Sequence, residues 1–339
     1  MPTMDIFNNS AFSTTSLTGM VDKLDFQPGL LGQLGIFEPM PVRTRHVFVD
    51  RRDGTLALIP TSADGAPPEA LGVDERDAVP LKTTRLTKRF TLYAHELDGL
   101  RGFGTETELQ SVQAEVARRT ERIRADMELT HEHHRLGALQ GKLLDADGST
   151  VIYDYFSEFG ETEPSSVNFD LTNADADVRK KSQEVTRSMA RSARGSFTPQ
   201  TQIHALAGDA FYDALIDHPS VRRAYENWAA ASNLAENVAF QSFTFAGITY
   251  HNYRGTDDNS TVAVDTDEAK VFPVGARDVF RVAMAPLESM EYVNTPGRSV
   301  YMMMIPDRER NMWTKGEIYS YPLYFCQQPR VLRTLTRTA

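Results

Sequence analysis

"TETELQSVQAEVARRTERIRADMELTHEHHRLGALQG", residues 105–141, is the stretch that decides the fold. Thr105 is a good N-cap, and Glu106 and Glu108 place acids in the first turn. A helix of this length would reach roughly 50 Å. A single compact domain has little use for such a helix, so the stretch predicts a flat or elongated protein. The apolar positions that follow helical spacing are Leu109, Val112, Val116, Ile123, Met127, Leu136 and Leu139.

The end of this helix contains "THEHHR" (130–135), which looks like a metal motif. A zinc-protease helix needs His-Glu-x-x-His, and here Arg135 stands at the second ligand position. A structural zinc site would also need further Cys or His ligands at suitable spacing, and the chain offers none. We therefore expect no metal, no catalytic residues and no cofactor. The histidines are expected to be solvated or to face another subunit, where a pH-sensitive contact would be their one role.

Two segments that precede the helix are predicted to extend from the body of the protein without forming a hydrophobic core of their own. Residues 1–40 predict an arm whose apolar side chains need another surface, although packing on its own domain is the alternative. Residues 41–97 predict a long β-hairpin loop, with a first turn at Arg52-Asp53-Gly54. The candidate contacts with other subunits are Phe26, Leu30, Leu31 and Phe37 in the arm, and Arg51, Arg52, Asp53, Asp74, Glu75 and Arg76 in the loop.

After the helix, strand and helix patterns alternate, which predicts an α+β fold. A hairpin is expected at 142–156 with its turn at Asp147-Gly148. A second helix is expected at 173–193, with Asn173 as N-cap. A third helical region, 208–231, should break near Pro219. Strands are expected within 240–255, 269–286, 298–306 and 318–335.

Composition narrows the class of protein further. The chain has 339 residues and a formal net charge of -10, which argues against a dedicated nucleic-acid binder. Its one cysteine, Cys326, favours a reducing compartment and reads as a buried, inert thiol. No signal peptide and no run of apolar residues long enough for a membrane span is visible.

Eight segments in order resemble the major capsid proteins of tailed bacteriophages, specifically the lambda-type E family with the Hong Kong 97-like fold. They are "FSTTSLTGMVDKLDFQPGLLGQLGIFEPMPVRTRHVFVDRRDGTLALIP" (12–60), "HELDGLRGFG" (95–104), "THEHHRLGALQGKLLDADGSTVIYDYFSEFG" (130–160), "IHALAGDAFYDALIDHPSVRRAY" (203–225), "AGITYHNYRG" (246–255), "FPVGARDVFRVAMAP" (272–286), "EYVNTPGRSVY" (291–301) and "YSYPLYFCQQPRVL" (319–332). Asp64, Tyr319 and Tyr321 depart from the family pattern and bear on loop contacts.

The resemblance implies a structural role and a division of the chain. The parts would be an N-terminal arm (1–40), an extended loop (41–97), a peripheral domain (98–197) with the spine helix at about 105–141, an axial domain (198–290) and returning C-terminal strands (291–339). The chain would self-assemble as hexamers and pentamers into an icosahedral shell that encloses double-stranded DNA, with arm and loop lying on neighbouring subunits.

The resemblance also implies partners and a location. A portal protein would join the shell, and a decoration protein is left open. Because no long acidic or helical segment precedes the arm, scaffolding is expected from a separate protein. DNA would be contacted only weakly and non-specifically, and no membrane is expected. Assembly would occur in the bacterial host cytoplasm, and the product would be the virion capsid. The rival classes are a metal-dependent enzyme and a soluble oligomeric ligand-binding protein.

Overall fold

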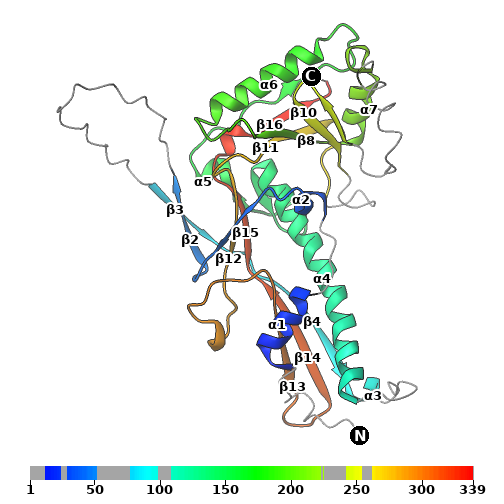
Figure 1. Ribbon diagram of the computed structural model, residues 1–339, viewed down its shortest axis with the longest axis vertical. Helices are drawn as coiled ribbons and strands as arrows, with labels where there is room; N and C mark the ends of the chain where they lie inside the picture. Colours follow the sequence, from blue (N-terminus) through cyan, green and yellow to red (C-terminus); the bar gives the residue numbers. More distant parts are fainter. Residues whose placement is uncertain are drawn as a thin grey trace, which may run out of the picture.

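The computed structural model describes residues 12–23, 29–51, 77–97, 108–222, 224, 242–253 and 262–338. Figure 1 shows an elongated molecule with a wide end, a long rod and a β-hairpin that projects from the side. Helices and sheets are mixed throughout, as the sequence patterns predicted.

The rod is built on the long helix α4 (Glu108–Gln140), which has 33 residues. The predicted helix is thus confirmed over nearly its whole length, and its first residues lie outside the described part. Its predicted apolar stripe is also confirmed, except at Leu109, whose side chain lies outside the described part. The buried positions are Val112, Val116, Ile123, Met127, Leu136 and Leu139.

One antiparallel sheet lies along the lower half of α4, in the order β13 (Tyr301–Pro306), β14 (Trp313–Ser320) and β4 (Leu86–Tyr93). Helix α1 (Thr14–Lys23) packs beside it, and the short α3 (Ala94–Leu97) follows β4. Apolar side chains of α1, α4 and the sheet meet in one core. The lower half of α4 therefore has a core of its own.

The wide end contains a six-stranded sheet in the order β7-β16-β11-β8-β10-β9. Its strands are β7 (Val167–Asn168), β8 (Gln202–Ala207), β9 (Ser242–Phe245), β10 (Ile248–Asn252), β11 (Glu268–Val274) and β16 (Arg333–Thr336). Helices α6 (Val178–Ser192) and α7 (Asp209–Asp217) share one hydrophobic core with it. Helix α6, which the expected division grouped with the long helix, thus packs with the 202–274 strands.

The two halves are joined where α4 ends. There, β1 (Glu38–Pro41), β12 (Phe280–Met284) and β15 (Pro322–Cys326) form a three-stranded sheet. The short α2 (Leu30–Gln33) lies against α4. The predicted hairpin at 142–156 is confirmed as β5 (Lys142–Leu144) and β6 (Val151–Asp154), and α5 (Tyr155–Glu158) follows it. Two 3-10 turns, η3 (Met290–Tyr292) and η4 (Pro329–Val331), complete the connections.

The projecting hairpin pairs β2 (His46–Arg51) with β3 (Asp77–Lys82) in antiparallel register. The predicted turn at Arg52-Asp53-Gly54 lies outside the described residues. Within 41–97, β2 and β3 leave and rejoin the body at neighbouring points (Figure 1), whereas β4 of the same predicted loop belongs to the sheet of the rod.

One predicted helix boundary differs from the structure and another is confirmed. Helix α6 begins at Val178 with Asp177 as its N-cap, because the Asp177 carboxylate accepts the Lys180 N–H at 2.9 Å. Asn173 instead forms a turn, in which its side chain accepts the Asp175 N–H. Helix α7 ends at Asp217, and the extended backbone of His218 confirms the predicted break before Pro219.

Gly316 in β14 is predicted to be a site where even a methyl group destabilises the rod. It pairs with Phe90 of β4, and a Cβ there would lie 2.2 Å from the ring of Phe90. Gly316→Ala should cost about 1–3 kcal/mol of unfolding free energy, because the ring of Phe90, which packs against the core of the rod, must shift. Gly19→Ala in helix α1 is the control, with nothing within 4 Å of the new Cβ. It should stabilise by about 0.5–1 kcal/mol. Denaturant titration of both variants checks the prediction, which equal midpoints would contradict.

Candidate functional site

A buried carboxylate on the long helix holds the N-terminal arm. Glu132 accepts the N–H of Leu31 at 2.8 Å and that of Gly32 at 3.2 Å. These are orphan donors of the first turn of α2, whose N-cap, Gly29, has no side chain to satisfy them. A Cβ on Gly29 would lie 2.5 Å from the Glu132 carboxyl carbon. A larger residue at position 29 would therefore have to displace the carboxylate that binds the arm.

Arg135 is the counter-ion of this carboxylate. Its guanidinium lies 3.1 Å from Glu132 and 2.6 Å from Glu128, and 5.2 Å from the ring centre of Tyr324. Burial works against the charge, but Tyr324, Glu128 and Glu132 outweigh it and raise the pKa of Arg135. Arg135, which occupies the position of the second zinc ligand, is thus part of a buried ionic network between α4, α2 and β15.

The three histidines of this stretch are buried, which corrects the expectation that they are solvated or face another subunit. His131 shares hydrogen bonds with Tyr324 Oη at 2.8 Å and Ser320 Oγ at 3.1 Å. His133 donates to the Asp145 carbonyl at 3.0 Å, and His134 is only 1% exposed. They are covered because the helix end is packed by the returning strands and by the hairpin after residue 141. A pH-sensitive contact between subunits cannot form through them.

Burial also sets the charge state of these histidines. It lowers the pKa of His131 to about 3, with help from the nearby Arg135 and His134. It lowers the pKa of His134 to about 4, with help from His133. Both rings are therefore neutral near pH 7. Within the described residues, no three His, Cys, Asp or Glu side chains are grouped so that they could hold a metal ion.

A second ionic cluster sits at the base of the projecting hairpin. Glu288 pairs with Arg45, just before β2, and with Arg85, just after β3, at 3.4 Å. Each guanidinium lies over a tyrosine ring, Arg45 over Tyr321 at 4.9 Å and Arg85 over Tyr319 at 5.3 Å. Glu288 therefore forms ion pairs with cations at both ends of the hairpin. The two tyrosines are the departures from the family pattern, and here they support the arginines.

The hairpin presents an apolar side chain to solvent. Val47 and Val49 of β2 are buried, while Phe48 between them is 68% exposed. Met290 and Val293, around η3, are 94% and 60% exposed. Exposed apolar groups of this size mark contact surfaces when they gather. None of the three was among the predicted contacts, although the alternation in "HVFVD" already pointed Phe48 away from its valine neighbours.

The predicted contacts have different places in the structure. Leu31 is only 1% exposed and lies in the core of its own chain. Leu30 and Phe37 are partly buried, and the Phe37 ring lies 5.4 Å from Phe280 and 5.1 Å from Tyr324. The arm over 29–41 thus packs on its own domain, which was the alternative. The residues whose side chains lie outside the described part are Phe26, Arg51, Arg52, Asp53, Asp74, Glu75 and Arg76.

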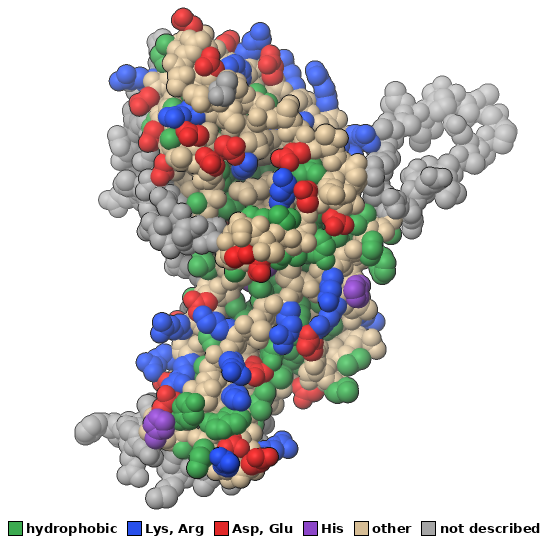
Figure 2. Space-filling view, turned by 180° about the vertical axis from the view of Figure 1, so that it is seen from behind, with side chains coloured by type: hydrophobic (Ala, Val, Ile, Leu, Met, Phe, Trp, Pro, Cys, Tyr) green, Lys and Arg blue, Asp and Glu red, His purple; other side chains and the backbone are tan. Residues whose placement is uncertain are grey.

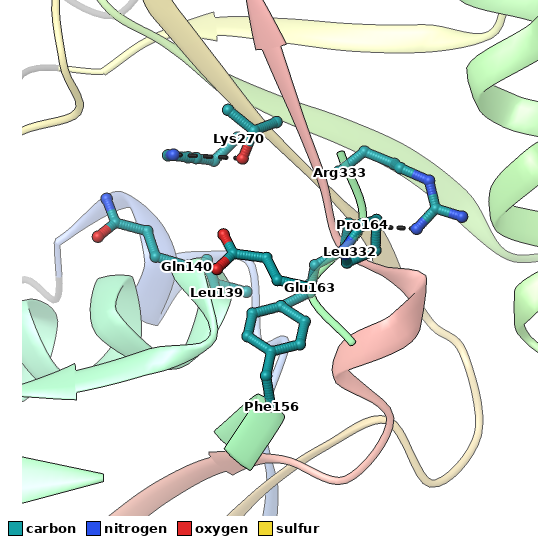
Figure 3. A pocket seen from close by; sticks show the side chains of 9 residues that line it. Leu139, Gln140, Phe156, Glu163, Pro164, Lys270, Leu332 and Arg333 are labelled. Carbon is teal, nitrogen blue, oxygen red and sulfur yellow. Dashed lines mark hydrogen bonds between the residues drawn. The ribbon is translucent and has the colours of Figure 1, made fainter. Parts of the chain in front are cut away.

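Figure 3 shows a small cavity where the end of α4 meets the six-stranded sheet. Its volume is about 10 Å³, roughly room for one water molecule. Lys270 donates to Thr334 Oγ1 at 3.2 Å above it, and Glu163 beside it pairs with Lys142. Cys326 nearby is fully buried, and burial raises the pKa of its thiol, as expected for an inert cysteine. The cavity is too small to hold a substrate or cofactor.

Comparison with solved structures identifies the fold. The structure is similar to that of a capsid protein from an Escherichia coli CFT073 prophage, with a TM-score of 0.59 and 13% sequence identity over 96% of this chain and 99% of that one. The chain therefore has the Hong Kong 97-like fold. Among the described residues, no helix has the length and apolar character that a membrane span needs.

Sequence comparison then identifies the family. The profile of the phage major capsid protein E family matches residues 13–337, so the chain belongs to that family. The major capsid protein of Salmonella phage Felix O1 is 25% identical over 354 aligned positions, which cover 95% of each chain. That of Pseudomonas phage KPP10 is 26% identical, covering 88% of this chain and 89% of its own. The chain is a bacteriophage major capsid protein that forms the capsid shell.

Removal of the Glu132 carboxylate should release the arm from the long helix. Glu132→Ala leaves two α2 donors and part of the Arg135 charge without a partner, which should cost about 3–5 kcal/mol of unfolding free energy. Hydrogen exchange at the amides of Leu31 and Gly32 should also become faster. The control is Glu121→Ala on the exposed face of α4, which should stay within about 0.5 kcal/mol of the parent. Unchanged protection of both amides in Glu132→Ala would rule out the anchor.

The buried histidines should make the fold sensitive to acid. Between pH 6.5 and about 4 the unfolded chain binds protons at His131 and His134 that the folded chain excludes, so stability falls as the pH falls. Each histidine should contribute about 1.4 kcal/mol per pH unit over this range. The plot of unfolding free energy against pH should therefore be less steep for His134→Asn than for the parent. Equal slopes in parent and His134→Asn would contradict the assignment.

Proposed function

We propose that the shell is icosahedral, is built from hexamers and pentamers of this chain, and encloses double-stranded DNA. The projecting β2–β3 hairpin carries the proposal. A two-stranded hairpin alone is marginally stable in water, and this one presents Phe48 to solvent. A neighbouring copy supplies the surface that covers it. The hairpin thus links copies that the rest of the chain keeps apart.

Charge and the remaining arm residues extend these contacts. Arg51, Arg52 and Asp53, and then Asp74, Glu75 and Arg76, are the mixed charges of the loop, suited to salt-sensitive contacts between subunits. In the arm, Phe26 and the exposed parts of Leu30 and Phe37 contribute, while the buried Leu31 holds the arm on its own chain.

The partners follow from the same role. The shell joins a portal protein, forms around a separate scaffolding protein and can carry a decoration protein. With a net charge of -10, the chain contacts packaged DNA weakly and without sequence preference. It assembles in the host cytoplasm and has no catalytic activity.

Phe48→Ser tests the proposal. The side chain is exposed, so the variant should fold and melt like the parent, while the yield of shells falls about tenfold or more, because one buried aromatic is lost at every hairpin contact. Particles are counted by sedimentation and negative-stain microscopy after expression of the full-length chain.

Phe48→Tyr is the matched control, because it keeps the ring and should keep most of the shell yield. Val47→Ser, on the buried face of the same strand, should instead lower the melting temperature. Normal shells from Phe48→Ser would show that this exposed face of β2 is not a contact.

A further inference from the structure

Helix α6 carries a row of cations on its solvent-exposed face. Its inner face buries Val178, Val185 and Met189 in the core of the wide end. Its outer face exposes Arg179, Lys180, Arg187 and Arg191, with Glu184 as the one acid among them. The side chains of Arg187 and Arg191 form no ion pair or hydrogen bond with any described residue. This face is called the basic face.

Helix α7 carries the opposite charge on its own outer face. Phe211, Tyr212 and Leu215 point into the same core, while Asp213 and Asp217 are exposed. These two acids are four residues apart, which places them on one side of the helix. Like the arginines of α6, their side chains have no partner among the described residues. This side is called the acidic face.

The two faces belong to one rigid unit but lie apart on it. Both helices pack on the same core, α6 across the top of the wide end and α7 along its side (Figure 1). Figure 2 shows Lys and Arg side chains standing out along the upper rim and more Asp and Glu on the left flank. Opposite charges on separate faces of one unit cannot neutralise each other within a copy. They can do so between copies.

We propose that the basic face of α6 binds the acidic face of α7 on the neighbouring copy of this chain. Such a contact joins two different surfaces, so each copy can bind one neighbour through α6 and another through α7. Contacts of this kind close into rings when the rotation from one copy to the next closes. The spacing also fits, because Arg187 and Arg191 repeat every four residues, as do Asp213 and Asp217, about 6 Å along each helix. The inference rests on the proposed assembly into hexamers and pentamers. The faces of α6 and α7 would be the surfaces through which neighbouring copies bind within one such ring.

A second copy fits these faces better than DNA does. A duplex carries continuous negative charge, and the acidic face on the same unit, together with the net charge of -10, would repel it. The acidic face has no use for DNA, whereas pairing between copies uses both faces. Binding of DNA or of an acidic protein by α6 is therefore the competing result of the experiment.

Charge exchange tests the pairing in the full-length chain. Three variants are compared with the parent: Arg187→Glu with Arg191→Glu, Asp213→Arg with Asp217→Arg, and all four changes together. All four positions are exposed, so the melting temperatures should stay close to that of the parent. Each double variant should lose about tenfold or more of its shells, because like charges then face each other. The quadruple variant should recover most of the yield, and the losses should shrink as added salt screens the repulsion.

Two outcomes would overturn the proposal. One is normal shell yield from either double variant, including the case in which only the α6 variant fails, which would indicate DNA or an acidic protein as the occupant. The other is a quadruple variant that assembles no better than the doubles. The result is independent of the hairpin test, since Phe48→Ser can assemble normally while the charge exchange still behaves as described.

Crosslinking tests the contact between α6 and α7 of neighbouring copies in a second way. Arg187→Cys combined with Asp213→Cys should form disulfide-linked chains of two or more copies under mild oxidation. The native thiol does not interfere, because Cys326 is buried. Ser149→Cys, in the exposed β5–β6 turn, replaces Arg187→Cys in the control and should give at least tenfold less crosslinked product with Asp213→Cys. Equal crosslinking in the two pairs would also overturn the proposal.

Discussion

The structure depends on one helix that has to be buried at both ends. Val112, Val116, Ile123 and Met127 of α4 pack in the core of the rod. Leu136 and Leu139 pack in a different core beside the wide end. Each such side chain contributes about 1.5–3 kcal/mol when it leaves water. Because the helix is continuous between the two cores, the rod and the wide end are held at a fixed distance along one axis.

The last turns of this helix also carry the polar network that fixes the arm. Glu132 binds α2, Arg135 binds Glu132 and Glu128, and His131 binds Tyr324 and Ser320. A buried carboxylate is tolerated because backbone donors and a guanidinium surround it. The sequence "THEHHR" (130–135) resembles a metal-binding motif, but in the structure its side chains hold neighbouring elements together by hydrogen bonds and ion pairs. Arm, helix and returning strand meet at this point.

The features that depend on residues close together along the chain could be predicted from the sequence. The α4 stripe, the hairpin at Asp147-Gly148 and the break before Pro219 follow from local spacing and turn chemistry, and the structure confirms them. The sequence did not predict what depends on distant residues. The bond between Glu132 and Leu31 spans 101 positions, and the burial of His131 depends on Tyr324, 193 positions away. No local pattern encodes such contacts, so exposed charge was the natural expectation for "THEHHR". Phe48 is the exception, because its alternation with Val47 and Val49 was local and readable.

The two excursions of the chain are held on the body by different kinds of contact. At the arm, Glu132 is 5% exposed and Arg135 13%, so water and salt hardly weaken their contact. At the hairpin base, Glu288 is 40% exposed and Arg85 47%. Solvent screens a pair of that kind, and its contribution is commonly about 0–1 kcal/mol. The arm is therefore held by an ionic contact that salt hardly weakens. The hairpin is instead held mainly by the apolar side chains of Val47, Val49 and Leu81, which are buried in a core shared with α4 and β15.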